Sequence, residues 1–164
     1  MRLSYGDLLN AGGTDLGRSR SFLVDQSRID AFADLTEDHQ WIHVDRVLAA
    51  KSQFGSTIAH GYLTLALVAP VISELLVVQD CAFAVNYGLD KVRFPAPLPS
   101  GSMVTGDARI VDATGQPGSV QVVVRVEMRS DAAPRPVCVA NSVIRFFGAN
   151  PYEGHDNRTH PAYH

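Results

Sequence analysis

Two short stretches of this chain hold the residue types needed to add water to a polarised carbonyl compound, or to remove it. Asp38 and His43 supply a carboxylate and an imidazole five positions apart, and Gly61 stands where a long apolar segment begins. Carboxylates and imidazoles transfer protons near neutral pH, and backbone N–H groups at a helix start stabilise negative charge on an oxygen. The two stretches therefore predict an acid/base site, provided that they meet in space.

The spacing between Asp38 and His43 restricts the backbone that joins them. Five helical steps rotate a side chain by about 140° beyond a full turn, and five strand steps place the two side chains on opposite faces. The pair therefore converges only across a turn. A turn is expected here, because the preceding helix should end near Thr36-Glu37 and Asp45 is a suitable N-cap for a following short helix.

Other interpretations of the same stretch stay open. Asp38 can simply cap or end a helix while His43 lies on the surface, which is the plainer arrangement. His39 and His43 can also bind a metal at i, i+4 together with Asp38 or Asp45, although Trp41-Ile42 and the flanking caps disfavour a helix there. A serine nucleophile is not indicated, because the sequence contains no Gly-x-Ser-x-Gly motif.

Apolar periodicity predicts three helices around these residues. Asp25–Ser27 offers N-caps, with Ser27 and Asp30 as a weakened capping box, for a helix whose apolar stripe reaches residue 35. A second, short helix follows and ends near residue 51. The third begins near Gly61, continues to residue 78 with a bend at Pro70, and is apolar enough to be buried on nearly all sides by protein.

The periodicity then changes to that of strands. The predicted strands cover residues 18–24, 82–94 with a bulge at Gly88, 103–112, 120–128 and 137–147. An antiparallel sheet wrapped around one long central helix is an α+β arrangement. A single curved sheet of this kind leaves an open edge, and pairing with a second copy is the usual way to cover it, so a homodimer is expected.

Length and composition are those of one domain in residues 1–147 with a polar tail in residues 148–164. Apolar residues make up 46% of the 164 residues, and the net charge of −3 without a basic cluster argues against a nucleic-acid partner. Cys81 and Cys138 are expected to be free thiols of a reducing compartment. Because the start is not a signal peptide and the long apolar segment contains Pro70 and Glu74, a cytoplasmic protein without a membrane span is expected.

The segments Phe32–Asp45, Phe54–Thr64 and Asn86–Pro97 together resemble the MaoC-like dehydratases. That family includes the (R)-specific enoyl-CoA hydratases and their nodulation-protein-N-like relatives, and the resemblance covers roughly residues 18 to 147. It implies a hot-dog fold, in which the strands wrap the long helix, and a homodimer with a substrate tunnel near the subunit boundary. It also implies an acyl-CoA or acyl carrier protein thioester as substrate and no cofactor.

The hydratase motif of this family reads Asp-x-Asn-Pro-x-His. Asp38 and His43 match its two catalytic positions, whereas Gln40 and Trp41 stand where the family has Asn and Pro. Some family hydratases also carry a serine eight residues after the His-Gly glycine, and Ala69 stands at that position.

The resemblance implies that Asp38 and His43 hold one water between them. Gly61, with its backbone N–H at the helix start, is the expected oxyanion donor. Gln40 and His60 are expected on the substrate-binding side, where His60 orients the loop.

Two rival functions use the same fold. An acyl-CoA thioesterase would hydrolyse the thioester, and a non-catalytic subunit would bind acyl thioesters and complete a heterodimer with an active partner. The spacing of Asp38 and His43 favours hydration over both, because a subunit without catalysis is expected to have lost the acid/base pair.

Overall fold

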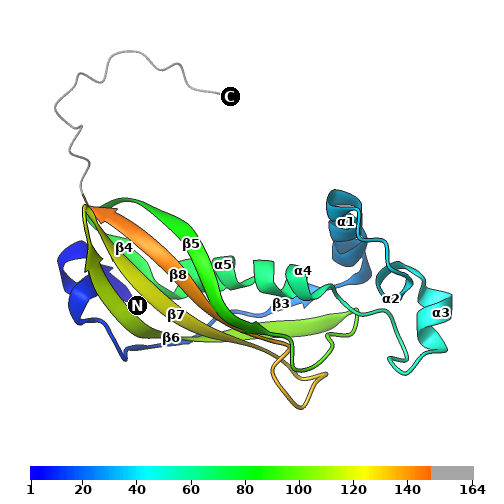
Figure 1. The fold of residues 1–164 in the computed structure, drawn as a ribbon. Coiled ribbons are helices and arrows are strands. Elements are labelled where there is room, and N and C mark those ends of the chain that lie inside the picture. Colours follow the sequence, from blue (N-terminus) through cyan, green and yellow to red (C-terminus); the bar gives the residue numbers. More distant parts are fainter. Residues whose placement is uncertain (149–164) are drawn as a thin grey trace.

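The computed structural model describes residues 1–148, in which six strands form one strongly curved sheet (Figure 1). Five of them follow the order β2-β6-β7-β8-β5, and β3 pairs with the other end of β6. Every pair in this sheet is antiparallel. The strands are β2 (Asp15–Arg18), β3 (Phe22–Val24), β5 (Cys81–Arg93), β6 (Ser102–Gln116), β7 (Ser119–Ser130) and β8 (Cys138–Gly148).

Strict alternation along β7 creates the inner face of the sheet. Val120, Val122, Val124, Val126 and Met128 are all buried, at 5% exposure or less, while the residues between them are half-buried. Successive side chains of a strand point to opposite faces, so these five residues form one continuous apolar ridge. The predicted period-two strand is confirmed.

Two consecutive helices lie along the concave side of this sheet (Figure 1). They are α4 (Gly61–Ala66) and α5 (Val68–Leu75), where the sequence predicted one bent helix to residue 78. Pro70 explains the break, because proline has no N–H to donate to the carbonyl of Ala66 and its ring crowds that carbonyl. The arrangement of a sheet around a central helix is the hot-dog fold, and the expected α+β class is confirmed.

The end of the apolar segment is a strand rather than helix. β4 (Val77–Gln79) pairs in parallel with β1 (Arg2–Ser4) at the start of the chain, and the 3-10 helix η1 (Tyr5–Asn10) follows β1. The charged amino group of Met1 donates to the carbonyl of Leu75 at 2.8 Å, which fixes the N-terminus against the end of α5.

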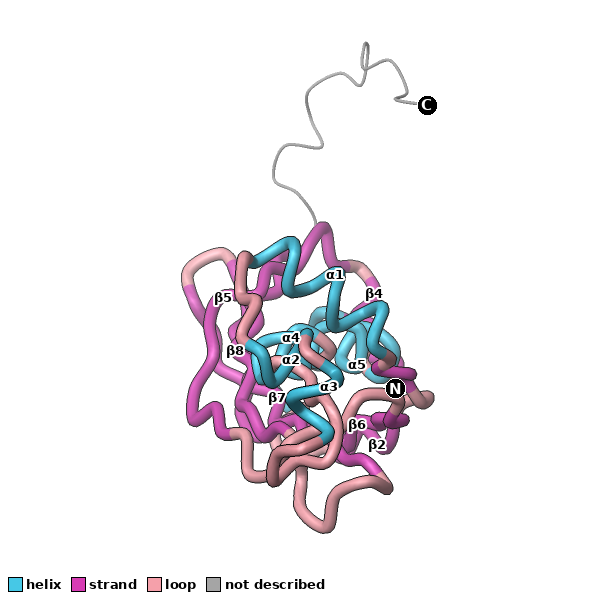
Figure 2. Tube along the Cα trace, turned by 90° about the vertical axis from the view of Figure 1, so that its right-hand side faces the viewer, coloured by secondary structure: helices cyan, strands magenta, loops and turns pink. Residues whose placement is uncertain are grey.

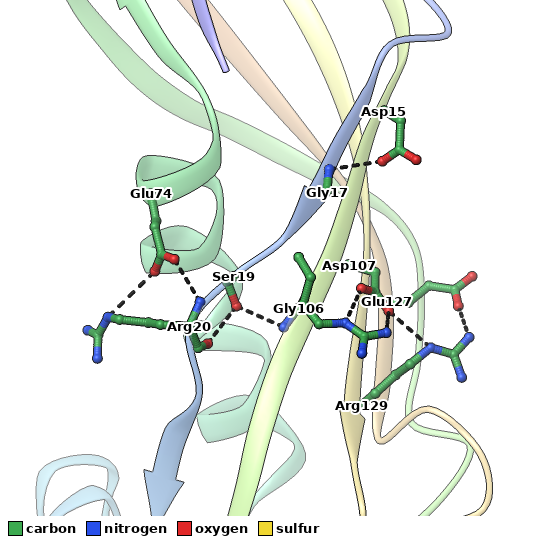
Figure 3. Close-up of polar contacts among 10 residues, drawn as sticks. Asp15, Gly17, Ser19, Arg20, Glu74, Gly106, Asp107, Glu127 and Arg129 are labelled. Carbon is green, nitrogen blue, oxygen red and sulfur yellow. Dashed lines mark hydrogen bonds and ion pairs between the residues drawn. The ribbon is translucent and has the colours of Figure 1, made fainter.

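Helix α5 packs closely on β6 at Gly106. A Cβ atom placed on Gly106 would lie 2.6 Å from Cγ1 of Val71, so only glycine fits beneath the helix. The backbone N–H of Gly106 donates to Oγ of Ser19 at 2.9 Å, and Ser19 N–H donates to the Gly106 carbonyl at 2.9 Å (Figure 3). Glu74 of α5 accepts from the backbone N–H of Arg20 at 2.7 Å, which ties the helix to the segment between β2 and β3.

Three short helices gather beyond one end of the sheet, as Figure 2 also shows. They are α1 (Gln26–Thr36), α2 (Trp41–Val44) and α3 (Arg46–Ala50). Asp25 caps α1 and Asp45 caps α3, as predicted. The capping box predicted for Ser27 and Asp30 is wrong: Ser27 donates to Asp25, and Asp30 accepts from the side chain of Gln26.

Within residues 1–148, strand β5 pairs only with β8 and is one exposed edge of the sheet. Its register shifts between Asn86 and Gly88, which confirms the predicted irregularity at Gly88. The large apolar side chains of this strand are 41% to 58% exposed, and they are Phe83, Val85, Tyr87 and Leu89.

Both cysteines are free, and burial raises the pKa of the Cys138 thiol to about 11.

Within residues 1–148, no helix has the length and apolar character to span a bilayer. The predicted polar tail lies outside the described residues, except for Gly148, which ends β8.

Candidate active site

The structure brings three polar side chains together from three different segments. They are Asp38, His43 and His60, and one carboxylate oxygen and one nitrogen of each imidazole all lie within 4.8 Å of one another. Asp38 follows the left-handed Glu37 that ends α1, His43 lies in the single turn of α2, and His60 is the N-cap of α4. The turn that the spacing of Asp38 and His43 requires is thus formed by the end of one helix and the start of the next.

His43 is buried and held by its ring. His43 is only 6% exposed, and its Nδ1–H donates to the carbonyl of Ile58 at 2.7 Å. A carbonyl oxygen can only accept, so Nδ1 carries the proton and a neutral ring presents its lone pair at Nε2. Burial lowers the pKa of His43 below the ordinary histidine value, and nearby His60 lowers it further against the opposing effects of the Ile58 carbonyl and Asp38.

His60 fixes the position of the loop that carries Asp38. Its residue is 1% exposed, and Nε2–H donates to the backbone carbonyl of Asp38 at 2.9 Å. The His60 ring also stacks on the His43 ring, with centroids 3.7 Å apart and an interplanar angle of 26°. The His60 imidazole thus contacts the backbone of Asp38 through its ring edge and the ring of His43 through its face.

The same contacts limit the ligand atoms that this cluster could offer to a metal. Nε2 of His60 is engaged with the Asp38 carbonyl, and its Nδ1 is enclosed without a hydrogen-bond partner among residues 1–148. His39, the other predicted ligand, lies outside the cluster, with Nε2 3.8 Å from the carboxylate of Asp34. The cluster therefore offers at most three ligand atoms, one each from Asp38, His43 and Nδ1 of His60, which is the smallest set that a zinc site uses.

Gly61 and His43 line one cavity of about 360 Å³. The ring of Phe94 stands directly over Gly61, because a Cβ atom on Gly61 would lie 3.0 Å from two ring carbons of Phe94. Buried Thr64 lines the same cavity. Since the first N–H groups of a helix have no intrahelical acceptor, the backbone at Gly61 offers a donor to this space.

Gln40 lies at the N-cap of α2 and is exposed. Its carbonyl accepts from the backbone N–H of His43 at 2.9 Å. Within the described part of the chain, its side-chain amide makes no hydrogen bond and is therefore free to meet a ligand. Within residues 1–148, Gln40 is therefore linked to the cluster by its backbone bond to His43 and not by its side chain.

A second, mainly apolar cavity of about 350 Å³ lies between α4 and β5. Its walls come from the other side of α4 and from the edge strand, and its lining residues include Tyr62, Leu65, Ala69, Asn86, Leu89 and Ser142. Tyr62 meets Phe94 edge to face, with ring centroids 6.4 Å apart. Tyr62 lines this apolar cavity and Phe94 lines the cavity at Gly61, so their contact joins the walls of the two cavities.

A larger cavity, of about 520 Å³, lies on the outer face of the sheet, away from these residues. Its charged groups are largely paired: Asp107 accepts from Arg18 and lies 3.4 Å from Arg129, whose guanidinium also meets Glu127 (Figure 3). Hydrogen bonds from Arg125 and Arg129 lower the pKa of Glu127. Carboxylates that are ion-paired and partly exposed are poor proton donors, so this surface is not the candidate site.

Sequence reasoning missed Gln26, Thr57 and Phe94. Gln26 and Thr57 bond to each other beside His43, but they are 31 positions apart and carry no motif. Phe94 stood within the Asn86–Pro97 segment of the resemblance, yet nothing in its spacing indicated that its ring would cover Gly61. Spacing rules act over a few residues, whereas these contacts are made by the fold.

Comparison with known proteins gives one matching family profile and several similar proteins and solved structures. The family profile described as "MaoC like domain" matches residues 8–132. The "3-hydroxyacyl-thioester dehydratase Z" of Mycobacterium tuberculosis is 43% identical over 145 residues, covering 87% of this chain and 95% of that protein. "Nodulation protein N" of Rhizobium leguminosarum bv. viciae is 40% identical over 151 residues, with coverages of 88% and 92%. The solved structure of a monoamine oxidase regulatory protein from Archaeoglobus fulgius is similar with a TM-score of 0.72 at 25% identity, over 92% of this chain and 98% of that one.

Proposed function

Because the chain belongs to the MaoC-like domain family, we propose that it catalyses the (R)-specific hydration of trans-2-enoyl-CoA, or the reverse dehydration of (R)-3-hydroxyacyl thioesters. The observation that carries this proposal is the meeting of Asp38, His43 and His60 within 4.8 Å beside the start of α4. A carboxylate and an imidazole this close can share one water molecule and handle both of the protons that hydration moves.

Hydration begins with polarisation of the thioester carbonyl. C3 of a 2-enoyl thioester becomes electrophilic as negative charge develops on the thioester oxygen, and a backbone N–H at Gly61 can donate to that oxygen. Because α4 has only six residues, the N–H itself rather than a long helix dipole is the main contribution. Phe94 lies over Gly61, so its ring bounds the space that the thioester enters.

The water then divides between the two carbons of the double bond. Its oxygen bonds to C3, one of its protons passes to a base, and C2 receives a proton from an acid. Neutral His43 suits the role of base, since its lowered pKa keeps Nε2 unprotonated and Nδ1–H is committed to Ile58. The proton that His43 takes from water is relayed through Asp38 to C2, so that the water supplies both the hydroxyl at C3 and the hydrogen at C2, and the roles reverse in dehydration.

His60 and Gln40 complete the substrate side of the proposal. His60 orients the Asp38 loop through Nε2–H and supports the His43 ring by stacking. Gln40 keeps an amide that can donate to the thioester or the water. The apolar cavity between α4 and β5 is suited to an acyl chain. Water and the thioester are the only reactants, so the reaction needs no cofactor.

A homodimer belongs to the same proposal. In the described part of the chain, strand β5 is a long edge strand with one unpaired side, and its exposed apolar residues are Phe83, Val85, Tyr87 and Leu89. Edges of this kind are usually covered, and a second copy can extend the sheet through β5. The cavity between α4 and β5 lies along this edge, so the partner would border the acyl-binding space.

The direct test is hydration of crotonyl-CoA by the purified full chain, followed as loss of the absorbance of the conjugated thioester. Asp38→Asn and His43→Ala should each lower kcat by about 10²–10⁴-fold, because each removes a positioned proton-transfer group. The matched controls Asp34→Asn and His39→Ala change the same residue types outside the cluster and should keep wild-type rates.

Two results would contradict this function. Full hydration by either cluster variant would remove the acid/base pair from the mechanism. Release of free CoA thiol without hydration would instead identify a thioesterase. Chiral analysis of the 3-hydroxyacyl product tests the (R) assignment separately.

A further inference from the structure

The amide of Gln26 joins three segments that build the candidate site. Its Nε2 donates to the carboxylate of Asp30 at 2.7 Å and to the backbone carbonyl of His43 at 2.7 Å, and its Oε1 accepts from the hydroxyl of Thr57. Both partners of Nε2 are acceptors only, and the partner of Oε1 is a donor. The amide orientation is therefore fixed by its neighbours, and every hydrogen-bonding group of the amide except one oxygen lone pair is used.

These bonds close a ring of contacts around His43. Gln26 holds the His43 carbonyl at one side and Thr57 at the other, while the next residue, Ile58, accepts from Nδ1–H of the His43 ring. The backbone N–H of Ile58 in turn donates to the carbonyl of Ile42 at 3.0 Å. The backbone and the imidazole of His43 are thus fastened to the same short segment, with Gln26 as the tie from α1.

Helix α2 depends on such ties, because it cannot hold its own position. It has four residues, and its N-cap Gln40 gives no side-chain hydrogen bond. A single helical turn is not stable on its own, since one hydrogen bond does not offset the ordering of its backbone. Thr57 is buried at 3% exposure, so the Gln26–Thr57 contact is shielded from competing water.

We propose that Gln26 is a positioning residue of the active site, which acts through His43 and Thr57 to set the imidazole against Asp38 and Gly61. This inference rests on the proposed function of His43 as a proton-transfer group. Gln26 lines neither the cavity at Gly61 nor the apolar cavity beside β5, so it does not touch the substrate. Its loss should lower the rate of the chemical step and leave substrate binding unchanged.

The test compares Gln26→Leu, Thr57→Val and Thr57→Ser with a matched Gln121→Leu variant. Gln121 lies on the outer face of β7 and contacts Arg145, far along the chain from His43 and Thr57. Gln26→Leu should lower kcat for crotonyl-CoA hydration by up to about 10²-fold with KM unchanged, since a small displacement of a reacting group has an effect of this size. Thr57→Val should show a smaller loss, and Thr57→Ser, which keeps the hydroxyl, should retain wild-type kcat.

A second readout follows the imidazole itself. The Cε1–H resonance of His43 is titrated by NMR in each variant, and its pKa should rise toward the ordinary histidine value in Gln26→Leu, because the loosened turn admits water to the ring. Gln121→Leu should titrate as the wild type does. Wild-type kcat together with a wild-type His43 titration in both Gln26→Leu and Thr57→Val would overturn the inference.

The two levels of the proposal remain distinguishable. An inactive wild-type protein would refute the proposed hydratase function, while the His43 titration would still decide whether Gln26 positions the ring. If Gln26→Leu does not fold, Thr57→Val decides, because it removes only one hydroxyl and keeps the size of the side chain. A loss confined to KM would also overturn the positioning role.

Discussion

His43 combines features that favour a neutral imidazole at physiological pH. The ring is buried, its Nδ1 proton is committed to Ile58, and its face is covered by His60. A protonated ring would lose hydration that the site does not replace, so the folded state favours the form with a free Nε2 lone pair. This is the protonation state that a base needs in order to accept a proton from water.

The lowered pKa of His43 predicts a specific dependence of stability on pH. Below the ordinary histidine pKa of about 6.5, the unfolded chain binds a proton at His43 more readily than the folded chain does. The free energy of unfolding should therefore rise with pH across the window from the folded pKa to about 6.5 and then stop rising from this source. Urea unfolding at a series of pH values checks this.

The control for this experiment is the other histidine of the stretch. His43→Gln should lose this part of the pH dependence, whereas His39→Gln, which alters an exposed ring, should keep it. Equal pH slopes for the wild type and His43→Gln would contradict the lowered pKa. Hydration activity should fall as the pH decreases through the lowered pKa of folded His43, because the proposed base becomes protonated there.

Packing of α5 on β6 decides where the helices lie, and therefore where α4 begins. The contact is closest at Gly106, whose missing side chain makes room for Val71. The break at Leu67, which the nearby Pro70 explains, separates α4 from α5 over the curved sheet. The N-terminus of α4, with His60 and Gly61, is thereby placed at the end of the sheet where α1 and α2 gather.

Gly106→Ala should destabilise the protein by about 1–3 kcal/mol, because the added methyl group overlaps Val71 in a packed interior. The measurement is the midpoint of urea unfolding. Gly12→Ala is the matched control, since a Cβ atom on Gly12 meets nothing within 4 Å. The double variant Gly106→Ala/Val71→Ala should recover part of the loss, and an undiminished loss in the double variant would show that the overlap is not its cause.

At the scale of the whole molecule, one copy leaves the backbone groups on the outer side of β5 without a strand partner among residues 1–148. Light scattering coupled to gel filtration should give the mass of two chains. The double variant Val85→Lys/Leu89→Lys should shift the protein to a monomer, because charged side chains on an edge strand oppose pairing. Val111→Lys, on the non-edge strand β6, is the control and should remain a dimer. A monomeric wild type would contradict the proposed assembly.

Local patterns in the sequence determined much of this protein. The N-caps Asp25 and Asp45, the end of α1 at Thr36 and the alternation of β7 follow from rules that act within a few residues, and each was predicted correctly. The turn between Asp38 and His43 also followed, because no regular element brings residues at that spacing together. The resemblance to a family then added the expected hot-dog fold.

The tertiary structure decided the contacts between distant segments. The Gln26 amide reaches His43 across 17 positions and Thr57 across 31, and the Phe94 ring covers Gly61 from another strand. Such contacts depend on how strands and helices are placed relative to one another, and side-chain chemistry at one position does not encode its distant partner. The sequence by itself supplied the candidate acid/base pair and the turn that joins it. Only the fold determined which residues hold that pair in place, because holding it requires contacts from three separate segments.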